Sequence, residues 1–306
     1  MERNIYLIEN SAQKLIGKHI ENLGKEGFDI SIPEKKKFNF EASVKSGKES
    51  LKIQVFFGKK GIKTVLQGNQ ESRLYKKVNS ILFGENLFSS PEIVEPESYI
   101  GIDESGKGDY FGPLVIAGVF VNNEIKNELV KIGVKDSKEL TDYQIKKITA
   151  EIKNIPSIKY NVVTINPEKY NQLYKQIRNV NKLLAWGHAR VLENLLDKVE
   201  TENAISDKFG NENLIKNSLM TKGEKINLHQ TTKGERFTAV AAASILAREK
   251  FISWFEEQQK KLYTSLPKGA SLLVEEAAKK LRDSYGEEFL SKVAKVHFKT
   301  TKKIIS

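Results

Sequence analysis

Apolar side chains follow two different periodicities in the first ninety residues. Helical spacing runs from Ala12 to Leu23 and again from Leu74 to Leu82, which predicts a helix at each place. Between them, four short segments alternate apolar and polar side chains, which predicts an antiparallel meander with one solvated face. These predicted strands are residues 28–32, 38–42, 51–55 and 62–66. The pattern therefore predicts a small α/β unit over residues 1–88.

The pattern changes at residues 89–97, which contain two prolines and no clear period and are predicted to be an interdomain linker. Beyond them, residues 98–306 begin with two apolar runs, 99–103 and 114–121, that predict adjacent core strands. Further strands are predicted at 159–165 and 203–206, and helices at 124–132, 142–154, 180–199, 237–255 and 272–281. In this region two strands come first and most of the helices follow them. This order predicts the α/β class, with a mixed sheet flanked by helices.

Composition limits the possible functions. The 306 residues are 39% hydrophobic, which is enough for a packed core, and 50 basic against 39 acidic side chains give a net charge of +11 that is compatible with a polyanionic partner. The absence of cysteine excludes disulfide frameworks, zinc ribbons and thiolate nucleophiles. The longest apolar run, residues 113–121, is far shorter than a membrane span, and the N-terminus lacks a signal pattern, so we expect no membrane partner and a cytoplasmic location.

The segment most indicative of chemistry joins an apolar strand to two consecutive acids, Asp103 and Glu104. Consecutive side chains on a strand point to opposite faces, so both acids are expected to serve one site only if the strand ends and the chain bends there. The following Ser-Gly-Lys-Gly loop is predicted to supply that bend and to let a ligand approach the backbone. An isolated acidic pair is more often a solvated turn, but the buried strand before it and the glycine loop after it favour a functional site.

The same segment nearly matches a phosphate-binding loop of nucleoside triphosphatases. Gly101, Gly106 and Lys107 have the spacing of that motif. Gly108, however, stands where the motif requires a Mg²⁺-binding hydroxyl, and Asp103 and Glu104 would direct negative charge toward the phosphates. Nucleoside triphosphate binding by this loop is therefore rejected.

Two more acids follow in positions that suit the same site. Asp207 ends the predicted strand at 203–206, and functional groups gather where strands end in open α/β sheets, so Asp103 and Asp207 are candidate neighbours. Glu235 precedes the alanine-rich helix. The alternatives are a helix cap or turn for Asp207 and a first-turn acid facing the helix dipole for Glu235. The pattern alone leaves these alternatives open.

Several motifs resemble those of the type 2 ribonucleases H. Residues 103–109 read DESGKGD and are followed by GPLV at 112–115, and further matches in the expected order are DSK at 136–138, NKLLAWGHA at 181–189 and AAASILAR at 241–248. Within this family, the Gly-Lys-Gly loop, a glutamate at position 235 and the AKVHF segment at 294–298 resemble ribonuclease HIII more than ribonuclease HII.

The resemblance implies a ribonuclease H-like α/β sheet flanked by helices in residues 98–306, preceded by a small TATA-binding-protein-like domain that binds substrate. It implies an endonuclease that cleaves the RNA strand of RNA–DNA hybrids and leaves 3′-hydroxyl and 5′-phosphate ends. It further implies two Mg²⁺ or Mn²⁺ ions held by Asp103, Glu104 and Asp207, with Glu235 completing the catalytic set. Carboxylates suit that role, because hard cations prefer oxygen ligands.

Selectivity for RNA requires a group that reads the 2′-hydroxyl. The residues expected to do so, or to contact phosphate, are those of the loop beside the proposed metals: Ser105, Gly106, Lys107 and Gly108. Lys138 is expected to contact phosphate as well. Ser244 is expected either to contact phosphate or to pack between helices, and His188 to pack on its helix.

Two rival functions stay open at this point. A ribonuclease HII-type enzyme would nick at single ribonucleotides in duplex DNA, and a catalytically silent protein would only bind nucleic acid, although the presence of all four acids disfavours it. An RNA–DNA hybrid is the expected partner, and basic strand positions such as Lys52 and Lys63 are expected to add phosphate contacts. The sequence indicates no obligatory protein partner, so a monomer is expected.

Overall fold

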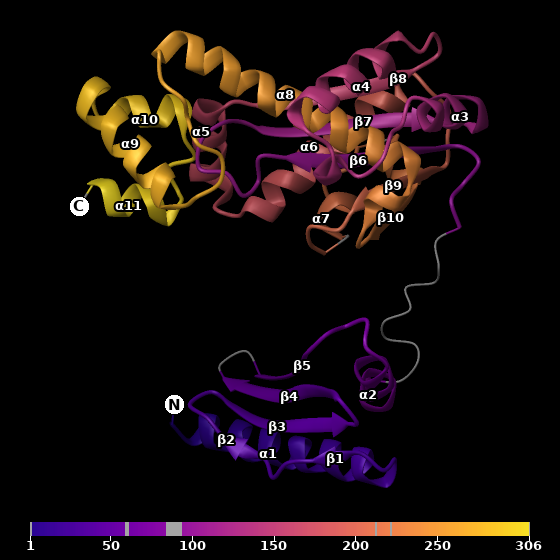
Figure 1. Cartoon of the computed structure of the whole chain (residues 1–306), viewed down its shortest axis with the longest axis vertical. Helices are drawn as coiled ribbons and strands as arrows, with labels where there is room; N and C mark the ends of the chain where they lie inside the picture. Colours follow the sequence, from indigo (N-terminus) through magenta and orange to yellow (C-terminus); the bar gives the residue numbers. More distant parts are fainter. Residues whose placement is uncertain (1, 59–60, 84–93, 212, 221, 306) are drawn as a thin grey trace. The chain divides into compact units, whose positions relative to one another are not determined.

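The computed structural model describes residues 2–58, 61–83, 94–211, 213–220 and 222–305 (Figure 1). The chain divides into two compact units, Met1–Ile93 and Val94–Ser306. The predicted linker at 89–97 lies outside the described residues up to position 93. Among the described residues, no helix combines the length and the apolar character needed to cross a membrane.

The N-terminal unit is an antiparallel sheet with two helices. The helices are α1 (Glu2–Lys25) and α2 (Arg73–Phe83), and the strands are β1 (Asp29–Ile30), β2 (Glu34–Lys35), β3 (Asn39–Ser46), β4 (Glu49–Gly58) and β5 (Gly61–Gln67). The strand order is β1-β3-β4-β5, β2 also pairs with β3, and every pairing is antiparallel. The predicted meander is confirmed. The short β2 is additional, since its two exposed charged residues show no apolar alternation.

Alternation along β4 decides which face of this sheet is covered. Ile53 and Val55 are buried, while Lys52 before them and Phe56 after them are exposed. Helix α1 packs its buried Ile16 against the covered face. Because successive strand side chains point to opposite faces, the other face of the sheet stays open to solvent.

The C-terminal unit contains more helices than strands. Its strands are β6 (Tyr99–Ser105), β7 (Leu114–Val121), β8 (Lys159–Ile165), β9 (Asn203–Asp207) and β10 (Asn227–Thr231). Its α-helices are α3 (Asn123–Lys131), α4 (Asp142–Asn154), α5 (Pro167–Ile177), α6 (Val180–Leu196), α7 (Asn213–Lys216), α8 (Thr238–Leu262), α9 (Leu272–Tyr285), α10 (Glu287–Val293) and α11 (Lys299–Ile305). Short 3₁₀ turns are η1 (Ser137–Glu139), η2 (Gly223–Lys225) and η3 (Gly234–Arg236).

The sheet of this unit is mixed, as the sequence predicts. Its order is β10-β9-β6-β7-β8, with β6 in the centre. The pairs β6–β7 and β7–β8 are antiparallel, whereas β9 runs parallel to β6 and β10 parallel to β9. The edge strand β10 is additional to the prediction, because Asn-Leu-His-Gln-Thr has a single apolar residue and no hairpin turn to announce it.

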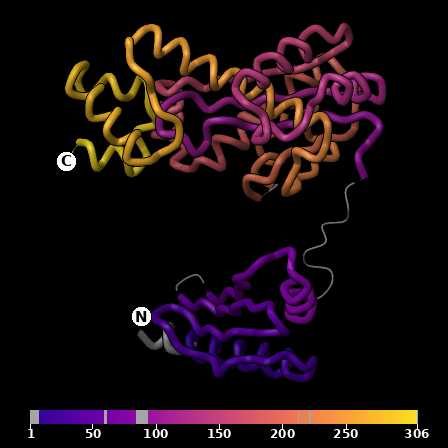
Figure 2. Tube along the Cα trace, in the orientation of Figure 1, coloured from indigo at the N-terminus to yellow at the C-terminus, as the bar shows by residue number. Residues whose placement is uncertain are grey.

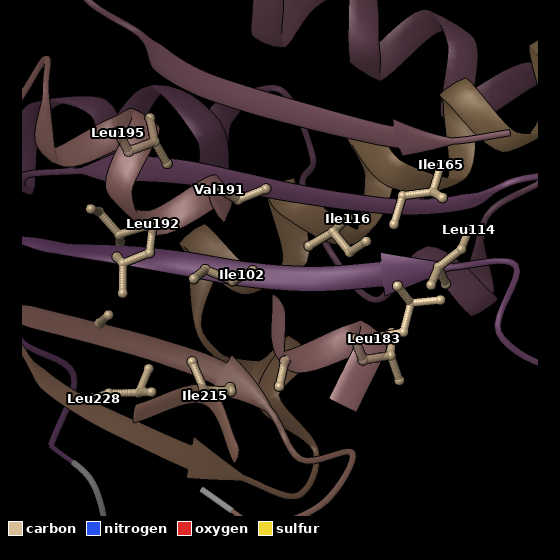
Figure 3. Close-up of a cluster of buried hydrophobic side chains, with 14 of the residues drawn as sticks. Ile102, Leu114, Ile116, Ile165, Leu183, Val191, Leu192, Leu195, Ile215 and Leu228 are labelled. Atoms are coloured by element: carbon tan, nitrogen blue, oxygen red, sulfur yellow. The ribbon is translucent and has the colours of Figure 1, made fainter. Parts of the chain in front are cut away.

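Helices cover both faces of this sheet. Helix α8 packs on β6 and β7, and α6 packs on β6, β7 and β8. The side chains between the sheet and α6 form a continuous apolar cluster that includes Ile102, Ile116, Leu183 and Leu192 (Figure 3). Burial of one such side chain contributes about 1.5–3 kcal/mol, so this cluster fixes α6 against the sheet.

The opposite face of β6 carries α8 at very short range. A Cβ added to Gly101 would lie 2.3 Å from backbone atoms of Ala239 and Val240, so only glycine allows the helix to approach this closely. Ile100 and Ile102 point to the α6 side and Gly101 to the α8 side. Because side chains alternate between the two faces of β6, successive residues of this strand face α6 and α8 in turn.

The helices at the end of the chain form a group of their own. Helices α10 and α11 both pack on α9, and α10 also packs on α5 (Figure 2). Helices α5, α10 and α11 are additional to the predicted elements, and α6 ends at Leu196 rather than at 199. The start of α5 follows ordinary rules, since Asn166 precedes Pro167 at the first helical position.

Candidate active site

The two central parallel strands separate where the predicted acids lie. β6 and β9 pair from Ile100 opposite Ala204 to Ile102 opposite Ser206, and Asp103 and Asp207 are the next residues on each strand. Ligand sites in open α/β sheets form at the carboxyl ends of such strands. The end of the β6–β9 ladder therefore places two acids on either side of one opening.

The structure corrects the predicted end of the first strand. β6 does not bend after Asp103 but stays paired with β7 as far as Ser105 opposite Val115. Asp103 and Glu104 consequently face opposite sides: Asp103 accepts a hydrogen bond from Ser244 of α8, and Glu104 is 3.0 Å from the His188 ring of α6. Both acids still line the same cavity, because the β9 side of the strand is unpaired at this level.

One cavity of about 390 Å³ collects all four predicted acids. Asp103 and Glu104 come from β6, Asp207 from β9, and Glu235 from the 3₁₀ turn η3. The other residues that line it belong to the glycine loop, to η1 and its N-cap, and to α8: Ser105, Gly106, Lys107, Gly108, Asp109, Asp136, Ser137, Lys138, Ser244 and Arg248. Folding thus brings together four acids that are up to 132 positions apart, the difference between 103 and 235.

Glu235 reaches the cavity through a contact between two loops. The amide of Gly234 donates a hydrogen bond to Asp207 Oδ1 at 3.0 Å, and the amide of Lys208 donates to the same carboxylate. This contact holds η3 against the end of β9 and places Glu235 beside Asp207. The helix-dipole alternative for Glu235 does not account for its position in the cavity.

The electrostatics of the cavity are unfavourable for a cluster of bare carboxylates. Burial raises the pKa of Asp103 to about 8, and the charge of Glu104 adds to that increase, while hydrogen bonds from Ser244 and from the Glu104 amide oppose it. Burial also raises the pKa of Asp207, opposed by the Gly234 amide and reinforced by Glu235 and Glu104. Perturbed acids in a cavity mark a site that attracts positive charge.

Two lysines at the rim supply part of that charge. Lys107 Nζ lies 3.7 Å from Glu104 Oε1, and Lys138 Nζ lies 3.9 Å from Glu235 Oε1. The Lys138 side chain is 78% exposed, so its ammonium is free to move toward a ligand. Arg248 also lines the cavity, but its guanidinium contacts Asp142 and the carbonyl of Ser137.

The donor set fits hard divalent cations. All four acids present oxygen, the ligand that Mg²⁺ prefers. Within the described part of the chain, no three His, Asp or Glu side chains are gathered closely enough to enclose an ion by themselves. Mg²⁺ is usually held by one or two carboxylates and keeps several waters.

The residues predicted to bind substrate lie in different environments. The loop from Ser105 to Gly108 lines the cavity, and Gly106 adopts a φ of +88°, a left-handed conformation that turns the chain beside the acids. Ser244 is only 8% exposed, and its hydroxyl lies 2.8 Å from Ser137 Oγ and donates to Asp103. Ser244 therefore lies at the cavity with its hydroxyl bound to Ser137 and Asp103, and its phosphate contact stays a prediction.

Five residues at or beside the cavity are additional to the predicted set: Asp109, Asp136, Ser137 and Arg248, which line it, and His188. His188 is fully buried, as expected for a packing residue, but its ring also hydrogen-bonds Glu104 and Ser206. Ser137 and Arg248 line the cavity. Both belong to motifs quoted above, and Arg248 lies one turn after Ser244 on α8, which is the signal that could have identified it.

Comparisons with known proteins agree on one family. The sequence profile described as Ribonuclease HII matches residues 100–301. Ribonuclease HIII of Protochlamydia amoebophila is 38% identical over 294 residues, which are 95% of this chain and 94% of the relative. Ribonuclease HIII of Chlamydia felis is 44% identical over 208 residues, which are 67% of this chain and 69% of the relative.

Solved structures with a similar fold point to the same family. Bst-RNase HIII in complex with Mn²⁺ is 29% identical, with a TM-score of 0.65 and coverage of 96% of both chains. Aquifex aeolicus RNase H3 is 26% identical, with a TM-score of 0.56, and the match covers 93% of this chain and 96% of that one. Profile, relatives and fold together show that the chain belongs to the ribonuclease HII family and, within it, to the ribonucleases HIII, so it is a ribonuclease H enzyme.

Proposed function

We propose that this enzyme hydrolyses the RNA strand of RNA–DNA hybrids at the cavity lined by the four acids and leaves 3′-hydroxyl and 5′-phosphate ends. The observation that carries the proposal is the convergence of carboxylates from β6, β9 and η3 on one cavity at the end of the parallel strands. The family supports a nuclease. The all-carboxylate donor set supports metal-assisted phosphodiester hydrolysis.

Asp103, Glu104 and Asp207 are the proposed ligands of two Mg²⁺ or Mn²⁺ ions, and Glu235 completes the set. A solved relative, Bst-RNase HIII, was crystallised with Mn²⁺, which supports a divalent ion here. Held by these carboxylates, two such ions would supply an activated water and charge stabilisation for the departing oxygen. Four negative charges offset the four positive charges of the ions.

The protein's own part is to hold the carboxylates at fixed separations and to orient the phosphodiester. The β6–β9 ladder sets the distance between Asp103 and Asp207, and the Gly234 amide fixes the orientation of Asp207. Lys107 and Lys138, at 3.7 and 3.9 Å from site acids, are placed to bind phosphate oxygens of the substrate. Positioning of this kind lowers the barrier because the reacting groups are already aligned.

Discrimination between RNA and DNA is assigned to the loop from Ser105 to Gly108. It lines the cavity directly after the two acids of β6. Gly106 adopts a left-handed turn beside the acids, and we propose that the backbone amides of this loop contact the sugar of the scissile nucleotide. A 2′-hydroxyl can donate to or accept from such a backbone, and deoxyribose offers no equivalent group.

The open face of the N-terminal sheet is proposed to add affinity for the hybrid. Lys45, Lys52 and Lys63 lie on this face, together with the exposed ring of Phe56. The face is not uniformly basic, because Glu41 accepts a hydrogen bond from Gln54 and lies 3.7 Å from Lys52 Nζ. Phosphate contacts by its lysines would make binding dependent on salt concentration.

Cleavage of three labelled 20-mer duplexes tests this function. The full-length protein is expected to cut a uniform RNA–DNA hybrid in the presence of Mg²⁺ or Mn²⁺, to lose the activity with EDTA, and to leave an all-DNA duplex intact. A third duplex with one embedded ribonucleotide identifies the ribonuclease HII-type alternative. Preferred nicking of that duplex, or cleavage of the hybrid in EDTA, would contradict the proposal. A monomeric state, independence from a protein partner and a cytoplasmic location stay predictions.

A further inference from the structure

A buried histidine connects the two strands that carry the acids. His188 lies on α6 and is fully buried. Its Nε2 is 3.0 Å from Glu104 Oε2 on β6, and its Nδ1 is 3.1 Å from Ser206 Oγ on β9. One imidazole therefore touches the residue after Asp103 and the residue before Asp207.

The hydrogen bonds of this histidine fix one oxygen of Glu104. An ionised carboxylate can only accept, so Nε2 donates its proton to Oε2. The second oxygen, Oε1, points to the Lys107 side, with Nζ at 3.7 Å. Glu104 therefore presents Oε1 to the cavity while Oε2 is held from the opposite face of the sheet.

The second hydrogen bond ties the histidine to the backbone that precedes Asp207. The Ser206 hydroxyl is buried and lies 2.9 Å from the carbonyl of Asp207 as well as 3.1 Å from His188 Nδ1, and its one proton is donated to either of these two acceptors. The β6–β9 ladder makes its last pairing at Ile102 and Ser206. His188 thus crosses from β9 to β6 just beyond the point where backbone hydrogen bonding between them stops.

Aromatic packing keeps this bridge away from solvent. The Phe209 ring lies 4.6 Å from the His188 ring, centroid to centroid, and Lys107 Nζ lies 5.6 Å from the centroid of Phe209. Hydrogen bonds in such a dry environment are stronger than in water. The bridge is consequently able to restrict the side-chain rotamer of Glu104, which is otherwise a flexible residue.

We propose that His188 is a positioning residue for the metal site: it holds Glu104 in the rotamer that offers a single oxygen to a divalent ion and ties the acid-bearing end of β6 to that of β9. The proposal rests on the function proposed above and deepens it. It implies that His188 changes metal affinity and turnover, whereas affinity for the hybrid comes from other residues. Outer partners of ligating carboxylates commonly have effects of this kind.

Full-length variants test the role by Mn²⁺ binding, measured by titration calorimetry without substrate, and by steady-state cleavage of the hybrid. His188→Leu keeps the apolar packing and removes both hydrogen bonds. It is expected to weaken Mn²⁺ binding and to lower kcat, each by about 10–100-fold, with KM for the hybrid unchanged. His188→Gln retains an N–H directed toward Glu104 and is expected to recover part of both losses.

Two further variants separate positioning from general destabilisation. Leu192→Ala truncates a buried side chain one turn along the same helix and is expected to lower the melting temperature without changing Mn²⁺ affinity. Ser206→Ala removes one anchor and is expected to weaken Mn²⁺ binding less than His188→Leu does. Should His188→Leu not fold, unchanged Mn²⁺ affinity in Ser206→Ala and His188→Gln would overturn the proposal.

The outcomes distinguish this proposal from the function on which it rests. If the unaltered protein binds Mn²⁺ and cleaves the hybrid while His188→Leu does both equally well, the role of His188 is refuted and the function stands. Equal losses of Mn²⁺ affinity and kcat in His188→Leu and Leu192→Ala would also refute the positioning role of His188. If the unaltered protein neither binds Mn²⁺ nor cleaves, the proposed function fails, and the role of His188 fails with it.

Discussion

The two sheets of this protein use their surfaces in different ways. The N-terminal sheet is antiparallel and leaves one face open, so its polar side chains form a surface. The C-terminal sheet has helices on both faces, and its polar side chains emerge where β6 and β9 stop pairing. An open face suits an extended polyanion, whereas a strand end between covering helices suits a compact, partly buried reaction centre. On this basis we propose that the N-terminal unit supplies affinity for the hybrid and the C-terminal unit the chemistry.

The largest expected effect comes from removing a single charge of the reaction centre. Asp103→Asn keeps the shape and one carbonyl oxygen of the side chain but loses the negative charge proposed to bind metal. We expect kcat for hybrid cleavage to fall about 1000-fold, equivalent to about 4 kcal/mol in the activation barrier. Hybrid binding, measured by fluorescence anisotropy, is expected to be retained, because the N-terminal face is unchanged.

Asp109→Asn provides a control matched in charge. Asp109 lines the same cavity, but its Oδ1 accepts a hydrogen bond from the Gly269 amide at 2.6 Å, a role that an asparagine oxygen can fill. Most of the activity is therefore expected to survive this substitution. Comparable losses in both variants would show that the total charge of the cavity matters rather than the ligand position of Asp103.

The two units also differ in the space that surrounds a glycine. An alanine Cβ at Gly101 would meet the α8 backbone at 2.3 Å, and neither strand nor helix can retreat without disturbing the cavity. Gly101→Ala is expected to destabilise the protein by about 3 kcal/mol, the upper end of the range for overpacking. Urea denaturation followed by circular dichroism measures the free energy of unfolding.

Gly17→Ala is the matched substitution in the N-terminal unit. Gly17 lies within α1 and has no atom within 4 Å of the position a Cβ would take. Here alanine is expected to stabilise the helix by about 0.5–1 kcal/mol, because glycine is the poorer helix former. Destabilisation by both substitutions would mean that the close approach of α8 to Gly101 is not the cause.

Local signals in the sequence were sufficient for most of the strands and for three of the four acids. The apolar run that ends in Asp103 and Glu104 can be recognised from the sequence alone, and so can the strand that ends in Asp207. β10 carries a single buried apolar residue, Leu228, and pairs in parallel with a distant strand. Its position, and that of η3 with Glu235 beyond it, depends on tertiary pairing that no local pattern records.

His188 shows a second limit of sequence analysis. It lies among apolar residues on α6, so its position predicts a buried side chain, and burial is what the structure shows. Its hydrogen-bond partners are Glu104 and Ser206, on two strands that follow each other in space but not in the chain. Periodicity indicates which face of a helix is buried, but it does not indicate what that face touches.

A smaller effect is expected from the open face of the N-terminal sheet. Reversing two charges, Lys52→Glu with Lys63→Glu, is expected to raise KM for the hybrid about tenfold with kcat unchanged, since phosphate contacts are lost but the metal site is not. The slope of log Kd against log salt concentration should decrease by about 1 for each contact removed. Steady-state cleavage measures KM and kcat, and anisotropy titrations at several salt concentrations measure the slope.

The control for this pair changes the same net charge on the other side of the unit. Lys14 and Lys18 are exposed on α1, the helix that covers the opposite face of the sheet. Lys14→Glu with Lys18→Glu is expected to alter Kd much less than the sheet variant. Equal weakening by both double variants would indicate a general charge effect and would remove the assignment of binding to the open face.

A buried charge behind the glycine loop is expected to affect stability rather than activity. Lys295 is fully buried, and its ammonium donates to the carbonyls of Asp109 at 2.9 Å and Gly112 at 2.6 Å, on the segment that joins the glycine loop to β7. Burial lowers the pKa of Lys295 to about 7, and the charge of Asp109 opposes that decrease. The group therefore links stability to pH.

The sign of this link follows from proton counts. Below pH 7 the lysine carries its proton in both states, and the full cost of burying the charge is present. Between pH 7 and about 10 the unfolded chain keeps a proton that the folded chain has released, so the free energy of unfolding rises with pH, by at most about 1.4 kcal/mol per unit.

Lys295→Met lacks this dependence. The difference in unfolding free energy between the unaltered protein and Lys295→Met, from urea titrations at pH 6 to 10, is expected to move in favour of the unaltered protein as pH rises. A difference that stays constant over this range would show that the carbonyls of Asp109 and Gly112 keep the ammonium protonated, and that Lys295 acts as a fixed positive charge holding the loop.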